Sequence, residues 1–385
     1  MTCRGLRAKS ARGVFSGKAV QHVVCICWLV LPLQVLADQL STWTSLTSGT
    51  TNDFFAVTYG KGTFVAVGTN GMLYSSTDGS NWTPQISGTT NDLEAVAYGN
   101  GLFVAMGGNG STRTSTNGTT WVGHLSGFNG AFHAVTYGNG LYVAVGFGGA
   151  IFTSTSATTW TPMASPTTNS LQAVIWANGM YLACGSLGTI LTSPDGNNWT
   201  SHDSGTTTAL HCLAYGAGTF VAAGFQGVLQ TSPDGVLWTN QISGTTNSLR
   251  GAIYTNSNFV LTGFRGSIIS STNGIDWIPR SSGVTDALRG IAYGSGRFLA
   301  VGHKGRILQT APLVAPTITS ISFNSGTATL AFATVNGLDY RVEYKDTFNG
   351  PIWALTNTAS GTGGLITVDD TTATSPSRFY RVVVQ

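Results

Sequence analysis

Tryptophan recurs at a fixed interval through most of this 385-residue chain. Seven tryptophans follow one another at intervals of 39 residues, and the residues around them repeat in the same phase, at Trp43, Trp82, Trp121, Trp160, Trp199, Trp238 and Trp277. Self-similarity of this period and regularity is the signature of an array of equal supersecondary units. The chain is therefore expected to fold as a repeat domain in which each unit packs against its neighbours.

One unit, residues 48–86, predicts four short strands. Runs rich in threonine, aromatic and small apolar residues occupy 54–59, 64–68, 72–77 and 81–83. Gly60-Lys61-Gly62, Asn70-Gly71 and Asp78-Gly79 separate these runs, and such sequences suit tight hairpins that need positive φ angles. The chain has 51 glycines and only 9% charged residues, a composition that disfavours helices. Each unit is predicted to be a four-stranded antiparallel meander.

The two ends of the repeat array predict a closed ring. Seven units begin at Ser48, Ser87, Ser126, Ser165, Ser204, Ser243 and Ser282, but the last stops at Pro312, before any fourth strand with a tryptophan. Residues 41–47, which include Trp43, supply that strand and remove an open sheet edge. A solenoid is the alternative, but it would not need an extra strand at its front. We therefore predict an all-β chain with a seven-bladed β-propeller closed by its N-terminal strand, followed by a small C-terminal β-sandwich.

The turn before each tryptophan carries a family resemblance. Residues 76–82 (STDGSNW), 193–199 (SPDGNNW) and 232–238 (SPDGVLW) resemble Asp-box, or BNR-like, repeats. These repeats occur in sialidase-like propellers and in photosystem II assembly-factor-like propellers. The third unit departs from the pattern, with Ser156-Ala157 in place of Asp-Gly. The resemblance covers about residues 40–312 and implies a structural hairpin, in which the aspartate caps its own turn, on the face away from the ligand.

The first residues are typical of a signal peptide. Five basic residues precede an apolar run at 23–36 that ends in small residues before Asp38. We assign residues 1–37 to this leader, which predicts a secreted protein of the extracellular space or cell envelope. The run of about 14 residues is shorter than the roughly 20 that cross a bilayer, so no membrane span is expected after cleavage. Cleavage leaves 13 basic and 15 acidic residues, which argues against nucleic acid as a partner.

The composition changes after the last repeat. Residues 38–313 are assigned to the propeller and residues 314–385 to a second module with six strand-like runs. Its segments 340–344 (YRVEY) and 379–382 (FYRV) resemble a short fibronectin type III-like β-sandwich. Such a module is expected to act as a stalk, a spacer or a surface contact.

Two cysteines remain in the predicted mature chain, Cys184 and Cys212. They occupy strand positions where other repeats carry small apolar residues, so they are expected to be buried thiols, with a disulfide between neighbouring repeats as the alternative. Their spacing is not that of a metal site, and no cofactor motif occurs. We therefore expect neither a metal nor a cofactor.

Differences among the repeats predict where a ligand binds. In a propeller, the first strands begin on the same face as the turns between second and third strands. The eighth residue of each unit, at the mouth of the central channel, is variable and mostly polar, and these ring residues are Phe55, Glu94, His133, Gln172, His211, Arg250 and Arg289. The turns add Asn70, Asn109, Gly148, Leu187, Gln226, Arg265 and Lys304. Sequence diversity is thus concentrated on one face.

Basic residues are concentrated in the last two repeats. Arg250, Arg265, Arg289 and Lys304 come from matching positions of two adjacent units, and arginine pairs suit bidentate binding of carboxylate, sulfate or phosphate. We predict an anion-binding patch there, flanked by His211, Gln226 and Phe264. The alternative is an ordinary solvated basic surface, with Asp276 and Asp286 as counter-charges.

Three functions remain open from the sequence. The favoured one is a non-catalytic binding module for an acidic glycan or a protein partner, and a purely structural interaction platform cannot be separated from it. The third is a sialidase-like glycan hydrolase, which would need a carboxylate near the arginines. Glu94 is the only glutamate of the propeller, and we place it some four blades from the cluster, with no acid paired to a histidine. His133 is accordingly interpreted as a hydrogen-bonding ring residue.

Overall fold

The computed structural model describes residues 39–312, 318–324, 327–334, 339–345, 354–362, 364–372 and 378–384. The predicted signal peptide, residues 1–37, lies outside the described residues. Every helix within these ranges is a 3-10 turn of three residues, beginning with η1 (Gln39–Ser41), and none is long and apolar enough to span a membrane.

The described residues between 43 and 310 form seven four-stranded antiparallel sheets. Sheet 1 contains β2 (Phe54–Gly60), β3 (Thr63–Gly68), β4 (Leu73–Ser76) and β5 (Thr83–Pro84). Sheet 2 contains β6 (Leu93–Gly99), β7 (Leu102–Gly107), β8 (Ser111–Ser115) and β9 (Val122–Leu125). Sheet 3 contains β10 (Phe132–Gly138), β11 (Leu141–Gly146), β12 (Ile151–Ser154) and β13 (Thr161–Met163). Sheet 4 contains β14 (Leu171–Ala177), β15 (Met180–Gly185), β16 (Ile190–Ser193) and β17 (Thr200–His202).

The remaining three sheets follow the same order. Sheet 5 contains β18 (Leu210–Gly216), β19 (Thr219–Gly224), β20 (Leu229–Ser232) and β21 (Thr239–Asn240). Sheet 6 contains β22 (Leu249–Thr255), β23 (Asn258–Gly263), β24 (Ile268–Ser271) and β25 (Ile278–Arg280). Sheet 7 contains β26 (Leu288–Gly294), β27 (Arg297–Gly302), β28 (Ile307–Thr310) and β1 (Trp43–Leu46). The second and third strands are joined by η2 (Thr69–Gly71), η3 (Gly108–Gly110), η4 (Phe147–Gly149), η5 (Ser186–Gly188), η6 (Phe225–Gly227), η7 (Phe264–Gly266) and η8 (His303–Gly305).

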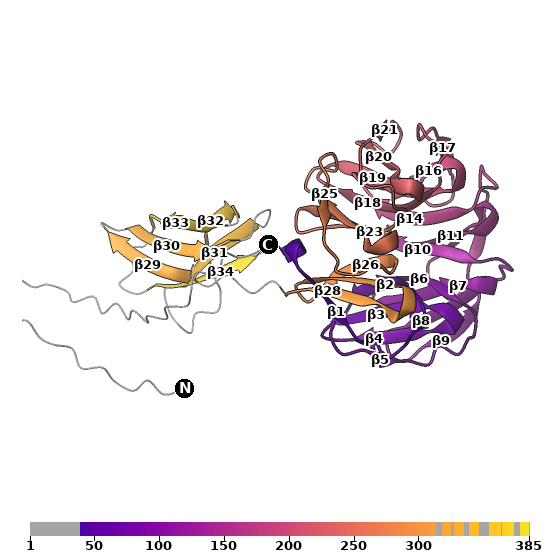
Figure 1. Cartoon of the computed structure of the whole chain (residues 1–385), viewed down its shortest axis with the longest axis horizontal. Coiled ribbons are helices and arrows are strands. Elements are labelled where there is room, and N and C mark those ends of the chain that lie inside the picture. The colour runs from indigo at the N-terminus through magenta and orange to yellow at the C-terminus, as the bar shows by residue number, and fades with distance from the viewer. Residues whose placement is uncertain are drawn as a thin grey trace, which may run out of the picture.

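The sheets are arranged in a ring. The first strands of successive sheets contact one another from β2 to β26, and β26 in turn contacts β2. Outer strands such as β5, β9, β17 and β21 lie at the circumference (Figure 1). A ring of four-stranded antiparallel sheets is a β-propeller, the architecture that the 39-residue repeat predicts.

The N-terminal strand completes the last sheet, as expected from the missing fourth strand of the seventh unit. β1 pairs antiparallel with β28, with Trp43 opposite Thr310 and Leu46 opposite Ile307. Trp43 is 8% exposed, and its ring centre lies 6.5 Å from that of Phe298 on β27. The two ends of the repeat array are therefore joined by both backbone hydrogen bonds and side-chain packing.

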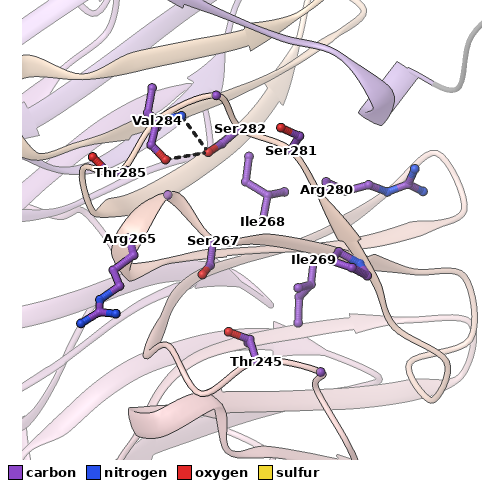
Figure 2. A pocket seen from close by; sticks show the side chains of 14 residues that line it. Thr245, Arg265, Ser267, Ile268, Ile269, Arg280, Ser281, Ser282, Val284 and Thr285 are labelled. Carbon is purple, nitrogen blue, oxygen red and sulfur yellow. Dashed lines mark hydrogen bonds between the residues drawn. The ribbon is translucent and has the colours of Figure 1, made fainter.

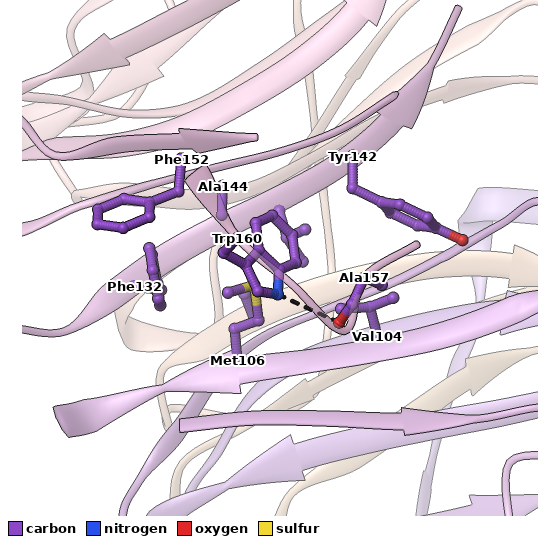
Figure 3. Packing of buried hydrophobic residues seen from close by; sticks show 10 residues of the cluster. Val104, Met106, Phe132, Tyr142, Ala144, Phe152, Ala157 and Trp160 are labelled. Carbon is purple, nitrogen blue, oxygen red and sulfur yellow. Dashed lines mark hydrogen bonds between the residues drawn. The ribbon is translucent and has the colours of Figure 1, made fainter. Parts of the chain in front are cut away.

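The core lies between neighbouring sheets, because each sheet is apolar on both faces. Figure 3 shows one such cluster, in which Met106 of sheet 2 packs with Phe132 and Trp160 of sheet 3. The Trp160 indole N–H donates to the carbonyl of Ala157, 3.1 Å away. Repeating this layer between every pair of neighbours buries the apolar faces that a single meander would expose.

The turn before Trp82 has the self-capping geometry predicted from the residues. An Asp78 carboxylate oxygen accepts the backbone N–H groups of Ser80 and Asn81, each at 2.8 Å. These hydrogen bonds hold the pKa of Asp78 far below its usual value. The Trp82 indole N–H donates to the carbonyl of Gly79 at 3.0 Å. Trp82 lies just before β5 rather than within the strand, so the fourth strand is shorter than predicted.

The described C-terminal residues form two three-stranded sheets. One contains β29 (Ile318–Asn324), β30 (Thr327–Ala333) and β33 (Leu365–Asp370), and the other contains β31 (Asp339–Lys345), β32 (Ala354–Ser360) and β34 (Phe379–Val384). Leu330 and Phe332 of the first sheet share a buried cluster with Tyr340 and Val342 of the second.

Cys184 and Cys212 are free, buried thiols. Burial raises the pKa of both thiols, to about 12 for Cys212. Of the two alternatives that the sequence leaves open, the structure has the core thiols and not the disulfide.

Candidate anion-binding site on the ring face

A β-bulge sets one residue of every first strand outside the hydrogen-bond ladder. In sheet 1 the register shifts between Phe54 and Ala56, so Phe55 has no partner on β3. The same shift in the other sheets leaves Glu94, His133, Gln172, His211, Arg250 and Arg289 unpaired. These are the ring residues, and all seven are half-buried. Because bulges re-aim side chains, a polar residue is tolerated here between buried neighbours.

The ring residues share one end of the sheets with the 3-10 turns. The backbone N–H of Phe264, the first residue of η7, donates to the carbonyl of Ser248, just before β22, at 2.8 Å. The next sheet also fixes some of these turns: an Asp53 carboxylate oxygen accepts the backbone N–H of Lys304 at 2.8 Å, which links sheets 7 and 1. We call this end of the sheets the ring face.

Arg250 and Arg289 are the two cations among the ring residues. The Arg250 guanidinium lies 5.4 Å from the centre of the Phe264 ring, and that of Arg289 lies 4.8 Å from the centre of the Phe55 ring. Burial lowers the pKa of both side chains, and the nearby Arg289 charge lowers that of Arg250 further. Within the described part of the chain, neither guanidinium forms an ion pair with a carboxylate.

His211 lies beside Arg250 on the ring. Burial, helped by the positive charge of Arg250, lowers the pKa of His211 to about 4. The imidazole is therefore neutral at neutral pH. Its Nδ1 and the Nε of Arg250 are both buried without a hydrogen-bond partner among the described residues. Buried polar atoms without partners are costly, so this part of the ring is less stable than it would be with both atoms hydrogen-bonded.

Arg289 is oriented by the turn of its own sheet. Its Nε donates to Nε2 of His303 at 3.0 Å, so this ring nitrogen acts as the acceptor. Burial and Arg289 lower the pKa of His303, which agrees with a neutral imidazole. One Asp53 carboxylate oxygen lies 3.7 Å from the same nitrogen. The contact with His303 holds Nε, and the terminal nitrogens of Arg289 have no carboxylate partner among the described residues.

Lys304 lies beside an acidic side chain of its own sheet. Its ammonium group lies 3.2 Å from an Asp286 carboxylate oxygen, and Arg306 binds the other oxygen at 2.6 Å. The counter-charge predicted at Asp286 is thus present, but Asp276 accepts a hydrogen bond from Asn273 in the turn at the opposite end of sheet 6. One carboxylate serves both Lys304 and Arg306, so this group keeps a net positive charge, but Lys304, unlike Arg250 and Arg289, contacts a counter-charge.

The structure also corrects the interpretation of Glu94 and His133. A Glu94 carboxylate oxygen lies 2.7 Å from Nδ1 of His133, so this histidine does have a paired acid. Glu94 also influences the pKa of Arg289, because ring closure leaves sheet 2 only two sheets from sheet 7 rather than four. The pair occupies matching positions 39 residues apart, a signal that the repeat alignment already contained.

Arg265 and Gln226 lie on the exposed tips of the turns, farther from the cations of the ring. Arg265 lines a groove of about 440 Å³ with Ser267, Ile268 and Arg280, and Figure 2 shows the two arginines on opposite sides of it. Gln226 lines an equivalent groove of about 690 Å³ one repeat earlier. Because the groove recurs at the same repeat position, it belongs to the general architecture of the sheets.

Two planar cations lie on this face, and neither contacts a carboxylate of the described residues. The central carbon of each guanidinium lies over an aromatic ring, and a guanidinium can donate parallel hydrogen bonds to carboxylate, sulfate or phosphate. Within the described ranges, no three histidine, cysteine or acidic side chains are grouped as metal ligands.

Comparisons with known proteins bear on the fold. No family model matches the sequence, and no curated protein matches it. YCF48 bound to a D1 peptide is similar at a TM-score of 0.59 and 18% identity, covering 70% of this chain and 95% of that one. YCF48 from Cyanidioschyzon merolae has a TM-score of 0.58 and 20% identity, covering 70% and 98%. A catalytically inactive virginiamycin B lyase from Staphylococcus aureus, solved with quinupristin, has a TM-score of 0.63 and 10% identity, covering 71% and 99%. At such low identity these likenesses show the fold alone: this chain contains a β-propeller.

Proposed function

We propose that this protein is a non-catalytic binding scaffold that holds an anionic group of a glycan or a protein between Arg250 and Arg289 on the ring face. The observation that carries the proposal is the pair of half-buried guanidinium groups without a carboxylate partner in the described residues. Burial of each cation costs free energy; the charges of Asp53 and Glu94 offset part of this cost for Arg289, and a bound anion would recover more. His211, Phe264 and Phe55 flank the pair and shape its surroundings.

The proposal includes the finer architecture. We infer that the seven four-stranded sheets are the seven blades of one propeller spanning residues 38–313, and that their turns are Asp-box repeats. We assign residues 314–385 to a fibronectin type III-like sandwich, because two sheets share one core there. We further infer that residues 1–37 export the chain to the extracellular space or cell envelope. A similar propeller bound to a peptide supports the use of this fold as a binding scaffold.

Binding to anionic ligands tests the proposal. The protein is titrated with acidic and neutral glycans and with acidic and neutral peptides, at low and at high salt. Arg250→Gln/Arg289→Gln is the test variant, because Gln172 shows that the ring accepts glutamine. We expect acidic ligands alone to bind, with loss of binding in the variant and weakening at high salt.

A charge-matched control separates the site from net charge. Lys61→Asn/Arg297→Asn also removes two positive charges, at the opposite ends of the strands, and asparagine occurs at the equivalent positions 100, 139 and 258. This control should bind like the wild type. Equal binding by the ring variant, or equal loss in both variants, would show that the two ring arginines are not the site.

One observation supports the hydrolase alternative. Glu94 orients His133 at 2.7 Å on the same face as the arginines, an arrangement suited to a general base. A sialidase-like site also needs a tyrosine paired with a carboxylate, and the described propeller residues show no such hydrogen bond. Turnover of aryl glycosides by the wild type, lost in Glu94→Gln, would favour this alternative, and absence of turnover would leave binding as the function.

A further inference from the structure

Three large apolar side chains stand exposed on the turns of consecutive sheets. Phe147 of η4 is 63% exposed, Leu187 of η5 is 67% exposed and Phe225 of η6 is 48% exposed. We call these three residues the apolar arc. The turns of sheets 1 and 2 carry Thr69-Asn70 and Gly108-Asn109 instead. The turns of the ring face are therefore polar over two sheets and apolar over the next three, and the two arginines follow in sheets 6 and 7.

Leu187 is unfavourable for the fold in two respects. Its φ is +54°, the left-handed conformation that asparagine and glycine adopt at the same place in η2, η3 and η4, and that Gln226, Arg265 and Lys304 share in the later turns. Its side chain is also exposed, so it gains little burial in return. A residue that costs the fold free energy on a face with a candidate site points to a contact with a partner.

The apolar arc is continuous with the anion site. The turn after η6 is η7, whose first residue Phe264 is half-buried and lies under the Arg250 guanidinium. A ligand held by Arg250 and extending across the turns of sheets 5, 4 and 3 would meet Phe225, Leu187 and Phe147 in turn. Phenylalanine can stack on a sugar ring, but a leucine gains most from contact with another apolar side chain.

We propose that the ligand of this face is a segment of another protein, with an acidic group that binds Arg250 and Arg289 and apolar side chains that cover the apolar arc. This inference rests on the proposed function and names the class of its ligand. The positive charges of Arg250 and Arg289 call for an acidic group in the ligand. The exposed apolar side chains favour a peptide over an acidic glycan as that ligand. Interfaces of this kind combine an apolar centre with charged anchors.

Two peptides of equal length and charge test the inference. Both alternate glutamate with a second residue, which is leucine or phenylalanine in one peptide and serine in the other. A sulfated dextran serves as the glycan-like polyanion. We expect the wild type to bind the apolar peptide about ten- to a hundredfold more tightly than its serine counterpart, because leucine-sized side chains are buried on binding.

The sister repeats supply matched variants. Phe147→Thr, Leu187→Asn and Phe225→Ser each introduce the residue of another turn, from Thr69, Asn70 and Ser186, so the fold should tolerate them. The triple variant should bind both peptides equally while keeping its arginine-dependent affinity for acidic ligands. If the triple variant unfolds, Leu187→Asn alone should still reduce the preference.

The outcomes are distinct. Equal binding of both peptides by the wild type, or an unchanged preference in the variants, would overturn the apolar-arc inference and leave the anion site standing. Stronger binding of sulfated dextran than of either peptide would overturn it in favour of a glycan. Failure of all three probes to bind the wild type would remove the proposed function together with the inference.

Discussion

Replacing His211 tests the electrostatics of the ring face without any ligand. The pKa of this imidazole is about 4, because of burial first and Arg250 second, whereas an exposed histidine titrates near 6.5. Above about pH 6.5 the ring is neutral in the folded and the unfolded chain and adds no pH dependence. As the pH falls, the unfolded chain takes up a proton that the folded chain refuses. Stability is therefore lost between about pH 6.5 and pH 4.

The magnitude follows from linkage. Each pH unit in this window costs about 1.4 kcal/mol, so at about pH 5 the loss is about 2 kcal/mol. Solvent still reaches this half-buried ring, and screening reduces the expected loss to about 1 to 2 kcal/mol. Glutamine does not titrate, and Gln172 occupies the same position in sheet 4. His211→Gln should therefore remove this part of the acid sensitivity.

Urea unfolding followed by tryptophan fluorescence measures the effect. The difference in unfolding free energy between the wild type and His211→Gln is compared at about pH 7.5 and about pH 5, where it should shift by about 1 to 2 kcal/mol in favour of the variant. Arg250→Gln should reproduce a smaller part of this shift, because it removes the secondary cause and leaves the burial. An unchanged difference between the two pH values would refute the buried, neutral histidine.

Three further results are expected from the scaffold. Asp78→Ala should lower stability by about 1 kcal/mol in thermal unfolding, whereas Asp78→Asn should cost less, because Asn117 accepts the same backbone N–H groups in the next repeat; equal losses would exclude the turn cap. Leu187→Asn should raise stability by about 1 kcal/mol in urea unfolding by relieving the left-handed leucine, and a loss would show that Leu187 supports the fold. Trp43→Ala should cost about 3 to 5 kcal/mol and lower the melting temperature, since β1 completes sheet 7, and a small effect would mean that this strand is dispensable.

The sheets could be predicted from sequence because their determinants are local and repeated. Trp82, Gly79 and Asp78 define one turn by direct hydrogen bonds, and the same turn recurs at a fixed period. The supply of the last strand by residues near Trp43 follows from counting strands. Which face is variable also follows from aligning the repeats.

The pairing of individual side chains was harder to predict. Lys304 reaches Asp286 through a long flexible chain, so its repeat position did not reveal its partner. Glu94 and His133 are neighbours because consecutive first strands lie side by side, a relation that follows from the period but requires closing the ring in space. The bulge at every ring residue depends on strand register, which composition and turns do not specify.

The bulges have a consequence for how readily recognition can change. A ring residue such as Gln172 lies outside the ladder, so replacing it breaks no cross-strand backbone pairing, while the fully buried Leu171 before it keeps the strand in place. The chain already carries phenylalanine, glutamate, glutamine, histidine and arginine at this one structural position. The ring is thus a set of seven structurally equivalent positions that accept different side chains. Single substitutions at these positions can change ligand specificity without disturbing the backbone pairing of the sheets.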